Sequence, residues 1–124
     1  MKFLFNFQPQ FHERVARGEK LQTIRRHRED GKRPAPGDIA CLYAHLRTAN
    51  ARLLREAPVT RCCAVRIDFE DDTLVIDGHK LAWGERVDFA QADGFPTWLA
   101  MRQFFVELYG LDTFEGFCVE WAAP

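Results

Sequence analysis

Apolar and polar residues alternate along several stretches of the chain, and a period of two is typical of β-strands with one buried face. In residues 1–7, Phe3, Phe5 and Phe7 fall on one side. The longest alternation covers residues 59–70, where the apolar face consists of Val59, Cys63, Val65, Ile67 and Phe69. Further strands are predicted over residues 21–25, 39–46, 73–76, 79–81 and 114–121. Asp77-Gly78 lies between two of them and is a typical hairpin turn.

Two segments have helical periodicity instead. Phe11 and Val15, four residues apart, predict a short amphipathic helix over residues 9–17, and Gly18 suits the position that follows a helix. A second helix is predicted over residues 97–109, where the apolar positions are Trp98, Met101, Phe104, Phe105 and Leu108.

These elements predict a mostly β (α+β) fold with two peripheral α-helices. The 124 residues suit one domain, residues 1–124. Seven strands in so short a chain must close on themselves or cover their edges, which favours a small β-barrel. No apolar run is long enough to cross a bilayer, and the first residues lack the pattern of a secretory signal, so we expect a cytoplasmic protein without membrane contact.

Charge is distributed unevenly, although 17 Lys and Arg nearly balance 18 Asp and Glu. Residues 1–66 hold 14 basic and 6 acidic residues, and residues 67–124 hold 3 and 12. Such asymmetry indicates either a face that binds a polyanion or two oppositely charged halves that attract each other in the fold.

The cysteines and histidines are not spaced as the ligands of a metal site usually are. Cys41, Cys62, Cys63 and Cys118 form no C-x-x-C pair, and the histidines are scattered. We expect buried thiols, no metal site and no cofactor. The acidic run of residues 70–72 could bind a hard cation, but three acids at a turn are more commonly solvated.

One basic segment combines groups that could form a site. It reads G-E-K-L-Q-T-I-R-R from Gly18 to Arg26. In an extended strand Thr23 and Arg25 face the same way, and Lys20 on the preceding turn could lean toward them. The alternative is a solvated edge strand.

This segment resembles the G-x-K-x-x-T-x-R signature of ASCH domains, which have a PUA-like β-barrel fold. Three further stretches match in register: R-P-A-P-G-D before the strand with Leu42-Tyr43, R-T-x-x-x-R-L-L at residues 47–54, and A-D-G-F at residues 92–95. The second of these is similar to small ASCH proteins often encoded by phages and prophages. The resemblance spans nearly the whole chain.

The resemblance implies a cleft beside the barrel, lined by the Lys–Thr–Arg strand and by the acidic residue before the second helix. Some ASCH proteins are amidohydrolases of N4-acylated cytidines, in which a Lys, a Thr and a Glu act together. The resemblance puts Lys20, Thr23 and Asp93 in these roles. Asp93 stands where that enzyme type uses Glu, and one methylene less shortens its reach, which reduces the rate when geometry is critical.

The leading expectation is therefore a domain that binds RNA or a nucleoside-like ligand, as a monomer. The expected binding residues are Arg25, Arg26, Arg28 and Tyr43, whereas Trp98 fits the helical stripe and belongs in the core. A small hydrolase of modified nucleosides is the alternative, and a ribonuclease follows in third place.

Overall fold

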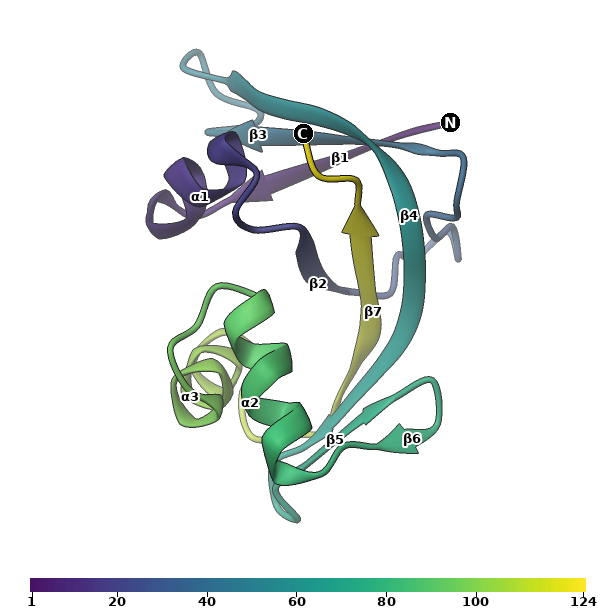
Figure 1. The fold of residues 1–124 in the computed structure, drawn as a ribbon, viewed down its shortest axis with the longest axis vertical. Helices are drawn as coiled ribbons and strands as arrows, with labels where there is room; N and C mark the ends of the chain where they lie inside the picture. The colour runs from purple at the N-terminus through teal and green to yellow at the C-terminus, as the bar shows by residue number, and fades with distance from the viewer. The chain divides into compact units, whose positions relative to one another are not determined.

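The computed structural model describes residues 1–124 as a strand-rich α+β fold with a mixed β-sheet and three α-helices (Figure 1). The strands are β1 (Lys2–Phe7), β2 (Gln22–Arg26), β3 (Ile39–Ala44), β4 (Arg52–Asp68), β5 (Thr73–Ile76), β6 (His79–Lys80) and β7 (Phe114–Trp121). The helices are the 3-10 turn η1 (Pro9–Phe11), α1 (His12–Arg17), α2 (Trp83–Ala92) and α3 (Trp98–Tyr109). No helix has the length and apolar character needed to cross a membrane.

The strand order is β1-β3-β4-β5-β6, and β7 pairs with both β2 and β4. Strands β1 and β3 are parallel, whereas β3–β4, β4–β5 and β5–β6 are antiparallel. The order ends at β1 on one side and β6 on the other, so the sheet is not closed.

The structure confirms the predicted apolar faces. Phe3, Phe5 and Phe7 are all buried, and so are the five apolar residues of the predicted alternation over residues 59–70, of which Phe69 lies just beyond the end of β4. The hairpin is confirmed as well: Asp77 and Gly78 both have positive φ, 49° and 80°, as a type I′ turn requires. Gly18 ends α1 in the left-handed region at φ 76°.

Strand β4 begins at Arg52, seven residues before the predicted start. A bulge at Leu42/Tyr43 shifts its register against β3, so the early part of β4 lacks a clean alternation. Pro58 within this part has no N–H to donate, but its carbonyl accepts from the N–H of Ala122 at 3.0 Å.

The prediction of two helices is wrong, because α2 was missed. Only Ala90 of α2 is buried, so the helix has almost no apolar stripe to detect. Its start is held instead by Glu85, whose carboxylate accepts from the N–H of Ala82 at 2.9 Å. In α3, Leu108 was expected in the apolar stripe and is 50% exposed.

The residues fall into two compact units, each built from segments distant in sequence. Unit 1 comprises residues 1–22, 34–62 and 119–124, and unit 2 comprises residues 23–33 and 63–118. Strands β1 and β3 with α1 belong to unit 1. Strands β5 and β6 with helices α2 and α3 belong to unit 2, while β2, β4 and β7 contribute to both. One domain over residues 1–124 stays a prediction.

Candidate functional site

Strand β2 brings Thr23 and Arg25 together, as their two-residue spacing predicts. The Arg25 guanidinium donates through Nη1 to Thr23 Oγ1 and, at 3.0 Å, to the carbonyl of Ile24. Thr23 is buried and Arg25 partly buried. The hydroxyl oxygen of Thr23 therefore accepts from a cation, and its own hydrogen is available for another acceptor.

Asp93 lies near this pair within unit 2. Desolvation lowers the pKa of the Arg25 guanidinium, whereas the negative charge of Asp93 and, at alkaline pH, that of the Tyr109 phenolate raise it. Because arginine titrates far above neutral pH, Arg25 stays charged. Thr23, Arg25 and Asp93 thus form one cluster, which we call the arginine cluster.

Asp93 occupies the C-terminal cap of α2 and is 4% exposed. A carboxylate there faces the negative end of the helix dipole, an unfavourable position that the positive charge of Arg25 offsets. Asp93 does not cap the start of the following helix, α3. Thr97 caps α3, and its hydroxyl accepts from the N–H of Ala100 at 3.0 Å.

Tyr109 is the site residue that the sequence did not reveal. It is the last residue of α3, and the guanidinium carbon of Arg26 lies 4.9 Å from the centre of its ring. Tyr109 also acts electrostatically on Arg25. A tyrosine beside a helix-ending glycine carries no local signal that it meets two arginines of a distant strand.

The backbone of β7 packs closely against the backbone of β2 at Arg25. Gly116 of β7 lies so near that a Cβ there would overlap the carbonyl oxygen of Arg25. Glycine is therefore required at this position by the approach of β2 and β7, not by its φ angle.

The exposed residues that follow Arg25 form a basic segment, residues 26–33, with Arg26, Arg28, Lys32 and Arg33. Within it, Arg28 pairs with Asp30 at 2.9 Å. The N–H of Lys32 and the guanidinium of Arg28 lower the pKa of Asp30. Two expected binding residues, Arg26 and Arg28, are thus exposed on one segment of unit 2.

Lys20 and Tyr43 belong to unit 1. The side chain of Lys20 is buried, and its ammonium lies 4.9 Å from the centre of the Phe11 ring. Tyr43 is half-buried in β3. The participation of both residues in a site with Thr23 and Asp93 stays a prediction.

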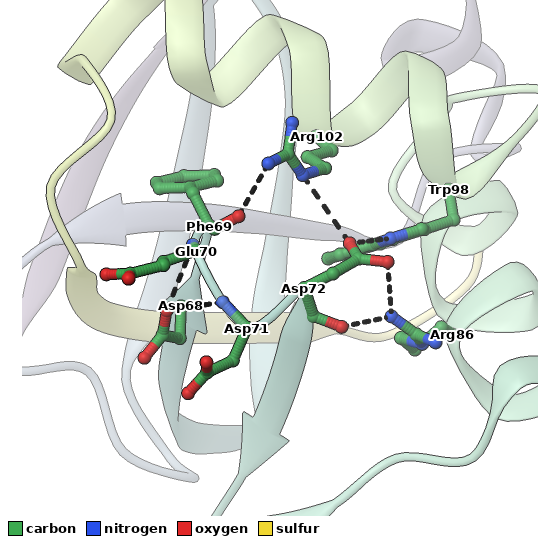
Figure 2. Close-up of polar contacts among 8 residues, drawn as sticks. All are labelled: Asp68, Phe69, Glu70, Asp71, Asp72, Arg86, Trp98 and Arg102. Atoms are coloured by element: carbon green, nitrogen blue, oxygen red, sulfur yellow. Dashed lines mark hydrogen bonds and ion pairs between the residues drawn. The ribbon is translucent and has the colours of Figure 1, made fainter.

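The acidic run of residues 70–72 divides into two kinds of residue. Glu70 and Asp71 are exposed, as expected. Asp72 instead accepts from the indole N–H of Trp98 at 2.9 Å and lies 3.4 Å from both Arg86 and Arg102 (Figure 2). Asp72 is therefore more than a solvated acid: its side chain is 47% exposed, but its carboxylate ties α2 and α3 to the turn between β4 and β5. Trp98 is buried, as expected.

Of the four thiols, those of Cys41, Cys63 and Cys118 are buried as predicted, and that of Cys62 is half-buried. Burial, with the carboxylate of Glu56 nearby, raises the pKa of Cys41. The thiol of Cys41 therefore does not resemble an activated nucleophile.

The arginine cluster and the basic segment together offer a planar cation, a hydroxyl, a buried carboxylate and exposed positive charge within unit 2. This set suits an anionic ligand with amine and carbonyl groups. Comparisons with protein-family models, curated proteins and solved structures give no match to this chain.

Proposed function

We propose that this chain is an ASCH-type domain with a PUA-like barrel that binds RNA or a nucleoside-like ligand. The observation that carries the proposal is the arginine cluster, at the start of the basic segment. The motif resemblance of residues 18–25 points to the same residues, and the seven strands agree with a PUA-like fold.

Each group has a distinct role in the proposed recognition. The Arg25 guanidinium presents paired donors to a phosphate or to a base edge. The Thr23 hydroxyl donates to a ligand oxygen, because its own oxygen already accepts from Arg25. Asp93 accepts from an exocyclic amine, as carboxylates do from cytosine. The basic segment adds attraction for phosphates that is independent of sequence.

Hydrolysis of N4-acylated cytidine is the alternative. It requires Thr23 as nucleophile and a base such as Lys20 to take its proton. The bond from Arg25 to Thr23 Oγ1 favours binding instead, since a lone pair held by a cation is less available for attack.

Fluorescence anisotropy with a labelled single-stranded RNA of about twelve nucleotides tests the proposal, at several salt concentrations. Arg25→Lys keeps the charge but removes the planar fork of N–H donors, and we expect roughly five- to 150-fold weaker binding, equivalent to about 1–3 kcal/mol. The double variant Arg26→Ala/Arg28→Ala should flatten the log–log salt slope by about 1.4, at ~0.7 for each phosphate.

Arg66→Lys is the matched control. Arg66 is an exposed arginine of unit 2 on β4, where it pairs with Glu115 at 3.8 Å. Equal losses in Arg25→Lys and Arg66→Lys, or no RNA binding by the wild-type protein, would refute RNA recognition by the arginine cluster. Turnover of N4-acetylcytidine that disappears in Lys20→Ala would replace the binding function with the hydrolase.

A further inference from the structure

We propose that Arg26, whose guanidinium lies over the Tyr109 ring, is a stacking platform for a nucleobase, and that the ligand is therefore a single-stranded RNA. This inference rests on the proposed function and adds to it a residue and a strand requirement. Aromatic side chains suited to base stacking are few near the basic segment in the sequence. The platform arises only when α3 brings its last residue to the end of β2.

The first observation behind this inference is the contact between Arg26 and Tyr109. Its guanidinium carbon lies 4.9 Å from the centre of the Tyr109 ring, within the range of a cation–π contact. The residue is exposed. The guanidinium thus contacts the ring on one side, and because the residue is exposed we infer that a ligand can reach its other side.

The surroundings of Tyr109 carry the second step, because a platform must be rigid. The Tyr109 ring packs against Phe105 at a centroid distance of 5.7 Å and against Phe114 at 5.0 Å. Both phenylalanines are buried. An arginine side chain normally loses considerable rotamer entropy when it binds. Here the aromatic cluster already restricts Arg26, so less of that loss falls on binding.

Charge and position supply the third step. A base stacked on Arg26 lies one residue from the arginine cluster, and phosphates of the same strand lie within reach of the exposed positive charges of residues 28–33. Bases stack on arginine planes when they are unpaired and splayed out, as in single-stranded RNA. A base within a duplex presents only its edges, so a duplex gains nothing from this platform.

The test compares variants that separate the guanidinium plane from its charge. Arg26→Lys keeps the charge and loses the plane, Tyr109→Leu removes the ring under it, and Tyr109→Phe restores the ring. We expect the first two to weaken binding of a single-stranded RNA about tenfold, the effect of losing one stacked base. The salt slope should stay unchanged, because Arg26→Lys keeps the positive charge and Tyr109→Leu removes none. Tyr109→Phe should recover most of the affinity lost in Tyr109→Leu.

Two RNA probes complete the design: a strand of the same length with abasic sites, and the corresponding duplex. The platform predicts that Arg26→Lys has little effect on either, since neither offers a free base face. Wild-type affinity of Arg26→Lys for the intact strand, or an equal loss with the abasic strand, overturns the inference. In both cases RNA binding by the wild-type protein would still stand, whereas failure of the wild-type protein to bind any RNA refutes the proposed function itself. Because Arg26 is exposed, its substitution tests the platform even if Tyr109→Leu fails to fold.

Discussion

Asp72 is expected to stabilise unit 2 more than any other surface carboxylate, because three side chains from two helices meet it. Its carboxylate accepts from Trp98 Nε1 at 2.9 Å and pairs with Arg86 and Arg102 at 3.4 Å (Figure 2). The two arginines also bond to main-chain carbonyls of the same turn: Arg86 to that of Asp72, and Arg102 to that of Phe69 at 2.6 Å.

The cost of Asp72→Ala can be estimated from these contacts. Trp98 is 1% exposed, so its orphaned indole N–H costs about 1–3 kcal/mol. The two ion pairs add at most about 1 kcal/mol each, because the Asp72 side chain is 47% exposed and solvent screens it. Asp72 has φ 54°, a conformation that costs alanine roughly a further 1 kcal/mol. Allowing for overlap among these effects, we expect a total of about 2–4 kcal/mol.

Two further substitutions separate the contributions. Asp72→Asn keeps an acceptor for the indole and tolerates the left-handed backbone, so it loses only the two ion pairs, at most about 2 kcal/mol. Asp72→Gly relieves the backbone but leaves Trp98 without an acceptor, so its loss should fall between those of Asn and Ala.

Urea unfolding followed by tryptophan fluorescence measures these differences. Asp71→Ala is the control, because Asp71 is exposed on the same turn and a surface substitution of this kind changes stability by about 0.5 kcal/mol or less. If Asp72→Ala costs no more than Asp71→Ala, or if Asp72→Asn costs as much as Asp72→Ala, the reasoning from the indole bond is wrong.

Two further predictions concern backbone packing and pH. Gly116→Ala should lower both stability and RNA affinity, because its Cβ would overlap the Arg25 carbonyl. A Cβ at Gly84 meets no atom within 4 Å, so Gly84→Ala should stabilise α2 slightly. Equal melting temperatures for the two variants would contradict this prediction. The hydrogen bond from the Ala82 N–H lowers the pKa of Glu85, and His79 lowers it to a smaller extent. The ionised Glu85 carboxylate therefore stabilises the fold fully above the unfolded pKa of about 4.3, and this stabilisation is lost as the pH falls through the folded pKa. The melting temperature should fall less steeply between neutral and acid pH for Glu85→Gln than for the wild-type protein. Parallel curves of melting temperature against pH would refute this prediction.

Local patterns in the sequence predict a large part of this fold. The alternation of Phe3, Phe5 and Phe7 depends only on burial of one strand face, and the structure buries all three. Asp77-Gly78 determines its own turn through the positive φ values that these two residues tolerate. The spacing of Thr23 and Arg25 likewise determines their contact, because residues two apart on a strand share a face.

Other features depend on contacts between distant segments, which local patterns do not encode. Helix α2 was missed because it buries little more than Ala90. Tyr109 reads as the end of an apolar stripe, and only the packing of α3 brings it to Arg26. Asp72 reads as a solvated acid, and its role follows from arginines 14 and 30 residues further along the chain.

An NMR titration of the isotope-labelled protein with single-stranded RNA tests the central claim most directly. Binding by the arginine cluster and the basic segment predicts amide shifts that concentrate in residues 23–33, at Asp93-Gly94 and at Tyr109. The acidic turn of residues 68–72 and the β5–β6 hairpin should stay unperturbed. Saturable shifts confined to that turn or hairpin, with residues 23–33 unchanged, would contradict the account.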